Sequence, residues 1–424
     1  MAFSINSITA GIVASALQVF YWTWWFLVPI VLVFIFWEFW LFYIRTLYID
    51  KIKWVLLRVK TPKEILKTPK TMEQIFAVAF GMYSFGLKHF EKYWLGKVEY
   101  WASFELVGYA GGVYFYIRIP EGFRNMIESA IYSQYPEAEI EIVDDYIDLL
   151  PDVLPNDIYD VFGTDYVLIK PDAYPIRTYP YFEALISEEK VDTIANLTES
   201  LSRLKADETA WIQILIRPIL SKDWTPKAQE EINKLIGRKK PPPQPNVFLF
   251  ETGVFIKNLL LAIFQEPTWP ELEKPKEEKI SLAQFTKGEQ DIIRGIESKM
   301  SKLAFETTIR FLYIDRKDKF SRGNIASIFA TFFQLNDERS NSLKPNTATM
   351  TSVAKQPFKE QRKYYKKRQI YDRYRIRKMP HKVSILNIEE LATIYHFPST
   401  VVEAPMLRRA ESKKGEPPLS LPVE

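Results

Sequence analysis

The sequence opens with an apolar stretch, which constrains the rest of the chain more than any other feature. Up to Trp37 no side chain is charged at neutral pH, and from there to Ile44 only Glu38 is charged. About 20 apolar residues in a helix cross the hydrocarbon layer of a bilayer. A cleavable signal peptide has a basic start and a shorter apolar core, and uninterrupted apolar runs of this length are rare in soluble folds. The stretch therefore predicts a retained transmembrane helix.

The charges after the apolar stretch set its expected orientation. Eight Lys or Arg residues but only two acidic residues lie between Arg45 and Lys70. Cytoplasmic flanks of membrane helices are enriched in Lys and Arg, so we expect a single-pass protein with the bulk of the chain in the cytoplasm. Apolar residues at helical spacing beside these cations favour either a basic amphipathic helix on the membrane surface or an ordinary solvated helix face. The cations expected at the membrane interface are Arg45, Lys51, Lys53, Arg58 and Lys60.

The composition leaves little material for catalysis. No cysteine is present, which excludes disulfides, thiolate metal sites and cysteine nucleophiles. The three histidines, His89, His381 and His396, are far apart in the sequence, and no glycine-rich loop is followed by Gly-Lys-Ser or Gly-Lys-Thr. The formal net charge of +4 is too small to indicate a partner. We therefore expect no enzyme, no cofactor and no metal site.

The cytoplasmic part predicts an α+β fold. Residues 99–143 indicate the order strand, turn, strand, helix and strand, with Gly111-Gly112 as a hairpin signal. This order is typical of a ferredoxin-like α/β sandwich. Two further passes predict strands at Thr209–Pro218 and Phe305–Arg316 and a helix at Ser321–Gln334, which indicates either an internal duplication or convergent patterning.

Changes in composition divide the chain into eight expected segments. They are an extracytoplasmic N-terminus (1–18), a transmembrane helix (19–44), juxtamembrane basic amphipathic helices (45–95), ferredoxin-like modules (96–238), proline-rich linkers with an amphipathic helix at 247–264 (239–280), a third α+β module (281–350), a basic tyrosine-rich segment (351–380) and a C-terminal segment (381–424).

One segment is chemically distinctive. Residues 358–378 contain ten Lys or Arg residues, two acidic residues and four interleaved tyrosines. Cations neutralise phosphates and aromatic rings stack on bases, so the composition suits nucleic acid. It also suits anionic lipid headgroups, and a solvated helix that meets an acidic partner would look similar. The candidate nucleic-acid or anionic-lipid residues are Lys359, Arg362, Lys363, Tyr364, Lys366, Lys367, Arg368, Arg373, Arg375, Arg377 and Lys378.

Several stretches between residues 55 and 422 resemble a family of bacterial membrane proteins. The stretches are LLRVKTPKEILKTPKTMEQIF, YFYIRIPEGFRNMIESAIYSQYPEAEIEIVDDY, DAYPIRTYPYFE, WIQILIRP, FETTIRFLYIDRK and ILNIEELATIYHFP. That uncharacterised family is related to the N-terminal region of conjugative, type IV secretion-like DNA-pumping ATPases. In those ATPases a segment similar to YHFPSTVVEAPMLRRAESKKGEPPLSLP leads into a RecA-like motor, for which this sequence has no phosphate-binding loop. The resemblance implies a platform without a motor.

We therefore expect a membrane-anchored scaffold or accessory subunit of a type IV secretion or conjugation-like machine in the bacterial plasma membrane. It would dock a separate translocation ATPase, contact DNA through the basic segment and form homo-oligomers by analogy with such machines. One alternative is a lipid-binding structural protein. Another is a membrane-bound enzyme for a lipid-linked substrate, which would need convergent acidic groups that the sequence does not show.

Overall fold

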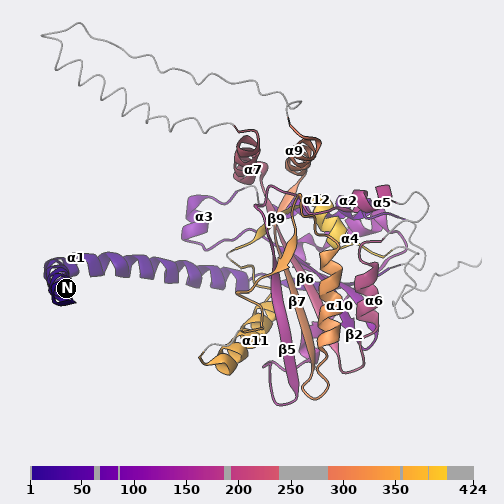
Figure 1. The fold of residues 1–424 in the computed structure, drawn as a ribbon. Coiled ribbons are helices and arrows are strands. Elements are labelled where there is room, and N and C mark those ends of the chain that lie inside the picture. Colours follow the sequence, from indigo (N-terminus) through magenta and orange to yellow (C-terminus); the bar gives the residue numbers. More distant parts are fainter. Residues whose placement is uncertain are drawn as a thin grey trace, which may run out of the picture.

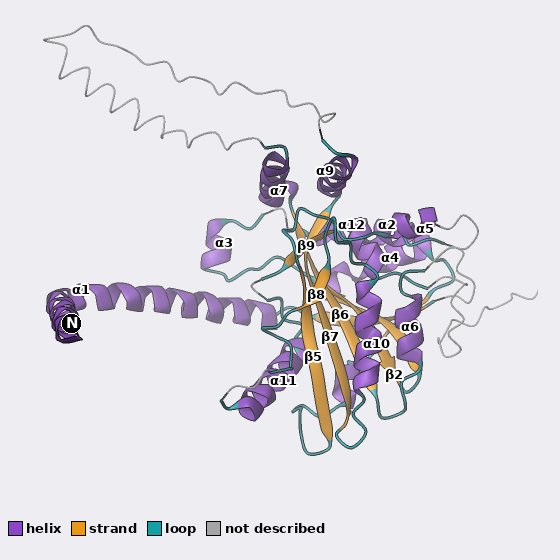
Figure 2. Cartoon of the chain, in the orientation of Figure 1, coloured by secondary structure: helices purple, strands orange, loops and turns teal. Residues whose placement is uncertain are grey.

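The protein has a mixed α+β fold, in which a long N-terminal helix leads into a folded unit built on one antiparallel sheet (Figures 1 and 2). The computed structural model describes residues 2–61, 67–84, 86–185, 192–237, 285–353, 357–380 and 382–398. The expected amphipathic helix at 247–264 and the proline-rich linkers around it lie outside the described residues.

The N-terminal helix α1 (Ala2–Asp50) leaves the folded unit and is exposed along most of its described length. Within the described residues, its segment Val28–Asp50 is the one helix that is long and apolar enough to cross a membrane. Only 11% of the most apolar 18-residue stretch of this segment is buried, whereas the core helix of a soluble protein would be mostly buried. Near its C-terminal end, Leu41 and Ile44 are buried where the helix meets the folded unit.

The sheet has nine described strands in the order β4-β1-β3-β2-β6-β7-β5-β8, with β9 pairing to one end of β7. The strands are β1 (Trp54–Lys60), β2 (Ala102–Tyr109), β3 (Gly112–Pro120), β4 (Glu139–Ile142), β5 (Tyr159–Leu168), β6 (Thr209–Ile219), β7 (Ala304–Arg316), β8 (Leu343–Pro345) and β9 (Ser384–Asn387). Every pairing between them is antiparallel.

The two halves of the sheet share one strand order. Among β1 to β4 the first strand lies between the third and the fourth, and the second strand pairs with the third. Strands β5 to β8 repeat this arrangement. The second strands of the two halves, β2 and β6, pair along eight positions from Ala102 opposite Ile216 to Tyr109 opposite Thr209. The expected modules 96–238 and 281–350 therefore contribute to a single sheet.

Helices cover both faces of the sheet (Figure 1). One face packs against α2 (Lys70–Ala79), α4 (Arg124–Gln134), α5 (Tyr179–Leu185), α6 (Ala195–Ser202), α10 (Arg322–Phe333) and α12 (Ile388–Ile394). The other face packs against α11 (Lys359–Arg375) and the 3-10 turn η3 (Tyr146–Leu149). The remaining elements are α3 (His89–Tyr93), α7 (Ser221–Leu235), α9 (Lys287–Met300) and the 3-10 turns η1 (Phe80–Met82) and η2 (Glu121–Phe123).

Coverage on both faces explains the composition of the central strands. In β6 the side chains of Ile212 and Ile214 enter the larger core, whereas Trp211 packs on the α11 side. A strand that is buried on both faces has a nearly continuous apolar run instead of strict alternation. The predicted strands at Thr209–Pro218 and Phe305–Arg316 are confirmed as β6 and β7.

Other local predictions had different outcomes. The hairpin at Gly111-Gly112 is confirmed as the β2–β3 turn, with Ala110 and Gly111 in the left-handed region. The amphipathic helix considered after residue 50 is wrong, because α1 ends at Asp50 and Trp54–Lys60 is strand β1. The apolar residues of Trp54–Lys60 fit the spacing of a helix and also that of a strand. Pairing with β3 and β4 stabilises the strand.

The core makes a direct prediction for Phe104, which is fully buried and contacts Phe76 and Tyr395 at ring-centroid distances of 4.9 and 5.3 Å. The substitution Phe104→Ala leaves a cavity beneath the sheet and should lower the free energy of unfolding by about 3–5 kcal/mol. Urea unfolding of the full chain in mild detergent measures this loss. The exposed Tyr109 of the same strand provides the control, and equal losses for Phe104→Ala and Tyr109→Ala would contradict the packing.

Candidate functional site

A row of polar and aromatic residues crosses the sheet on the face that α11 covers. Side chains directly opposite each other on paired strands share one face of a sheet. Seven residues on seven adjacent strands stand in one register: Glu141, Arg58, Tyr116, Glu105, Gln213, Arg310 and Asp165. We call these residues the polar row.

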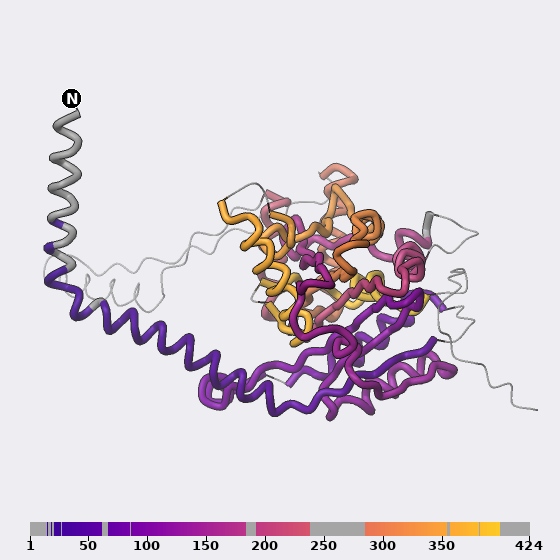
Figure 3. The backbone as a smooth tube through the Cα atoms, turned by 90° about the horizontal axis from the view of Figure 1, so that it is seen from below, coloured from indigo at the N-terminus to yellow at the C-terminus, as the bar shows by residue number. Residues whose placement is uncertain are grey.

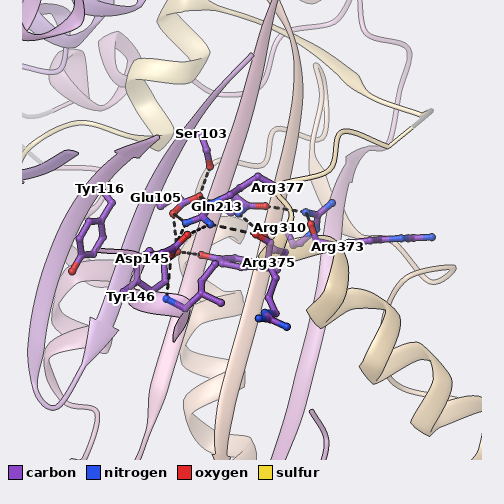
Figure 4. A network of polar contacts seen from close by, with 12 residues as sticks. Ser103, Glu105, Tyr116, Asp145, Tyr146, Gln213, Arg310, Arg373, Arg375 and Arg377 are labelled. Atoms are coloured by element: carbon purple, nitrogen blue, oxygen red, sulfur yellow. Dashed lines mark hydrogen bonds and ion pairs between the residues drawn. The ribbon is translucent and has the colours of Figure 1, made fainter. Parts of the chain in front are cut away.

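The central members of the polar row are buried and bonded to each other (Figure 4). Arg310 donates through Nε to Asp165 Oδ1 at 2.9 Å and through Nη1 to Gln213 Oε1 at 2.9 Å. Gln213 in turn donates through Nε2 to Glu105 Oε1 at 3.1 Å. Glu105, Gln213 and Arg310 have no exposed surface. Buried polar groups are costly unless they are bonded in this way.

The polar row also holds the C-terminal end of α11. Arg310 donates to the carbonyl oxygens of Arg373 at 2.9 Å and Lys378 at 3.2 Å, and Gln213 donates to that of Tyr374 at 3.2 Å. The last carbonyls of a helix lack partners within the helix and carry partial negative charge. The guanidinium of Arg310 therefore satisfies and stabilises this helix end.

Arg377, just after α11, adds the second cation of the network. Its Nε and Nη2 donate to the two carboxylate oxygens of Glu105 at 2.9 and 3.0 Å, and it also pairs with Asp145. Tyr146 and Ser103 donate their hydroxyl hydrogens to Glu105 at 2.8 and 2.5 Å. The Glu105 carboxylate thus accepts hydrogen bonds from four residues, Gln213, Arg377, Tyr146 and Ser103 (Figure 4).

These contacts determine the titration of the buried groups. Burial alone would raise the pKa of Glu105, but the charge of Arg377 and the hydrogen bonds from Arg377, Ser103 and Tyr146 outweigh it and leave that pKa lowered. Burial raises the pKa of Tyr146 and of Tyr374 well above the ordinary value. Their hydroxyl oxygens lie 2.7 Å apart, and both groups remain protonated at neutral pH.

Several of the cations predicted to bind nucleic acid or lipid instead contact groups of the protein itself. Lys366 donates to the carbonyl oxygens of Thr347 and Met350 at 3.1 and 3.2 Å. Arg375 pairs with Asp152 at 2.5 Å. Two more of these cations are buried: Lys367, which pairs with Asp160, and Arg377, which pairs with Glu105. A polyanion therefore has no access to them.

The other predicted residues of this segment lie on its outer surface. Lys359, Arg362, Tyr364, Arg368 and Lys378 are exposed, while Lys363 and Arg373 are half-buried. Arg368 has only a long contact of 3.9 Å with Asp372. Lys378 lies over the ring of Phe42 in α1, with Nζ 5.6 Å from the ring centroid.

The residues predicted for the membrane interface fall into two groups. Arg58 and Lys60 are in β1 and pair with Glu141 of β4. Lys51 and Lys53 are exposed at the end of α1, where they line a hollow of about 390 Å³. Arg45 is half-buried on α1.

Sequence reasoning missed the polar row and the role of Arg377. The available signal was a charged or amide side chain among the apolar residues of each strand, namely Glu105, Gln213 and Arg310. Their alignment depends on strand pairing over long sequence distances, which no local pattern contains. Within the described residues, no group of three or more His, Cys, Asp or Glu side chains could hold a metal ion.

Comparison with known families gives one match. The family model described as a domain of unknown function, DUF8128, matches residues 47–409. This range contains the whole sheet and α11 and begins near the end of α1. No curated protein matches the chain.

The buried ion pair makes a stability prediction. Replacing Arg377 with Met removes the main partner of a carboxylate that has no exposed surface. We expect a loss of about 3–5 kcal/mol in the free energy of unfolding, which is typical when one member of a buried pair is removed. Urea unfolding measures it. The exposed Arg368→Met on the same helix should stay within about 0.5 kcal/mol, and Glu105→Gln added to Arg377→Met should recover part of the loss.

Glu105 also makes a prediction for pH dependence. Its lowered pKa in the folded protein means that its stabilising contribution is present above the pKa of an unfolded Glu, about 4.3, and is lost as the pH falls through the folded pKa. The difference in unfolding free energy between the parent chain and Glu105→Gln should therefore shrink on acidification below about pH 5. Unfolding curves between pH 7 and pH 3 test this, and a constant difference would contradict the assignment.

Proposed function

Since the chain belongs to the DUF8128 family, whose function is unknown, we propose from its geometry that it is a membrane-anchored scaffold. In this proposal α1 crosses the bilayer once and the folded unit lies on the cytoplasmic side. The observation that carries the proposal is the exposure of α1, in which Phe34 and Phe39 are 69% and 68% exposed and most large apolar neighbours are similar. Apolar surface of this extent marks contact with lipid or with a partner.

The attachment of α1 supports a fixed scaffold over a loose tether. Leu41 and Ile44 are buried against the folded unit, and the indole nitrogen of Trp40 donates to the carbonyl oxygen of Tyr93 at 3.3 Å. The first cation of the basic flank, Arg45, follows directly. A helix held in this way transmits the orientation of the bilayer to the sheet.

The partner in this proposal is a translocation ATPase of a type IV secretion or conjugation-like machine. The resemblance of residues 55–422 to the non-motor part of such ATPases supports it. The chain would be an accessory subunit that docks the motor and forms homo-oligomers around it. Each half of the sheet would be a ferredoxin-like module, which the repeated order of β1–β4 and β5–β8 favours.

Contact with DNA is a second part of the proposal. Lys359, Arg362 and Arg368 are exposed on α11, as are the rings of Tyr364 and Tyr365, which are 49% and 64% exposed. Outward cations with accessible aromatic rings suit a nucleic-acid backbone and its bases. A lipid-binding structural role for the same surface is the alternative, and a membrane-bound enzyme is less well supported.

The topology of α1 can be tested cleanly because the chain has no cysteine. We expect a membrane-impermeant maleimide to label Ser4→Cys in intact cells, and to label Lys51→Cys only after permeabilisation. The reverse pattern would exclude a cytoplasmic folded unit. Recovery of the parent chain in the soluble fraction without detergent would exclude the anchor.

The outer surface of α11 makes a DNA-binding prediction. The triple variant Lys359→Gln, Arg362→Gln, Arg368→Gln should weaken binding of duplex DNA to the full chain in neutral-lipid nanodiscs. The variant should lose up to about three phosphate contacts. The slope of log K against log salt concentration should then become less negative by up to about 2.7. Titrations at several salt concentrations measure both effects.

The matched control removes three exposed cations outside α11, two at the C-terminal end of α6 and one in α7. The variant Arg203→Gln, Lys205→Gln, Lys222→Gln changes the net charge equally and should bind DNA like the parent chain. Equal weakening by both variants would indicate a general charge effect. Binding of the parent chain to anionic vesicles alone would favour the lipid-binding alternative.

A further inference from the structure

A loop beside α1 carries large apolar side chains on its surface. Its ends are joined where Ser84 donates through its hydroxyl to Glu99 Oε2 at 2.5 Å. Between these residues the loop contains the short helix α3, which Figures 1 and 3 show projecting from the sheet on the side from which α1 leaves. Phe90, Trp94 and Leu95 are 62%, 60% and 48% exposed. We call residues 88–97 the aromatic loop.

The inner side of the aromatic loop is fixed to α1. The rings of Tyr93 and Trp37 are 5.9 Å apart, and those of Trp94 and Trp40 are 6.4 Å apart. Trp40 also donates its indole hydrogen to the carbonyl oxygen of Tyr93. Further along, the hydroxyl oxygens of Tyr100 and Tyr48 lie 3.1 Å apart. The chain from Tyr93 to Tyr100 therefore follows α1 from Trp37 towards the folded unit.

Gly96 allows this close approach. Its φ is +65°, and a Cβ at this position would lie 2.4 Å from the backbone carbonyl atoms of Ile44. No other residue type fits such a contact without moving the backbone. The loop thus touches α1 at Ile44 through Gly96 and at Trp37 through Tyr93. These two levels on the helix are seven residues, or about 10 Å, apart.

These levels set the depth of the loop relative to a bilayer. The first cation after the apolar stretch is Arg45, so the hydrocarbon layer ends near Ile44 if α1 crosses the membrane. Helix α3 stands beside Trp37 and Trp40, on the bilayer side of that boundary. Tryptophan and tyrosine side chains favour this region of a membrane.

We propose that the aromatic loop is a second membrane contact, which inserts into the cytoplasmic leaflet beside α1. Phe90, Trp94 and Leu95 would enter the upper acyl chains, and the exposed Lys88 and Lys92 would face the headgroup phosphates. The inference rests on the proposed crossing of the membrane by α1. Continuity favours lipid over a protein partner, because the exposed surface of the loop adjoins the lipid-facing side chains of α1.

Two contacts with one leaflet would fix the tilt of the folded unit. A single helix permits the unit to tilt relative to the membrane plane, whereas a laterally displaced loop in the same leaflet opposes this tilt. The N-terminal end of α11 also projects on the side of α1 (Figures 1 and 3). The inserted loop would therefore hold the outer cations of α11 close to the membrane surface.

Depth-dependent quenching tests this insertion in the full chain. Single cysteines introduced by Phe90→Cys and Leu95→Cys are labelled with an environment-sensitive fluorophore after reconstitution into vesicles of phosphatidylcholine and phosphatidylglycerol. Nitroxide lipids labelled near the headgroup should quench both positions at least twofold more than Phe333→Cys, an exposed position on α10. Phe36→Cys on α1 should be quenched more by nitroxides placed deeper in the acyl chains.

The controls separate the failure of this inference from that of the anchor. Quenching at Phe36→Cys with none at residues 90 and 95 overturns the loop insertion and leaves the anchor intact. Absence of quenching at Phe36→Cys overturns both. Adding Phe90→Ser and Trp94→Ser to Leu95→Cys should lower quenching at residue 95 to the level of Phe333→Cys. Unchanged quenching would show that these side chains do not insert.

Discussion

A carboxylate at the centre of the sheet determines where one helix must lie. Glu105 sits on β2, next to the seam between the two halves, and has no exposed surface. A buried charge requires a counter-charge and hydrogen bonds, and the main counter-charge comes from Arg377, far away in the sequence. Because Arg377 follows α11 directly, this requirement sets the helix against the sheet, and Arg310 completes the attachment at the last carbonyls of the helix.

This attachment divides the basic segment into two surfaces with different roles. The buried side follows helical spacing through Lys367, Ile370, Tyr371 and Tyr374. The opposite side retains the cations that a phosphate could reach. Composition alone identified the basic segment but could not separate these surfaces, because Lys367 belongs to the buried side and looks the same in a count of charges. A cation at the spacing of the apolar residues was the available signal.

The local parts of the fold could be predicted from the sequence, whereas the assembly of those parts could not. The hairpin at Gly111-Gly112 and the strands β6 and β7 follow from turn residues and from runs of apolar, branched and aromatic side chains, all of which act over a few positions. The pairing of β2 with β6 joins residues about a hundred positions apart, and it creates both the single sheet and the polar row. The strand β1 was missed because its apolar residues also fit a helix, so that only its partners β3 and β4 decide between the two.

The position of the helices α7 and α9 has a consequence for how the chain can change. Strands β6 and β7 pair along eleven positions, although residues 220–303 lie between them. Trp224, Ile232, Ile293 and Ile296 pack α7 against α9, so the chain leaves and re-enters the folded unit at neighbouring points. A connection that leaves at α7 and returns at α9 can therefore change in length without any change in the pairing of β6 with β7. The pair of helices is therefore a site that tolerates insertions, at which evolution or an experimenter can exchange one insert for another while the strand register stays the same.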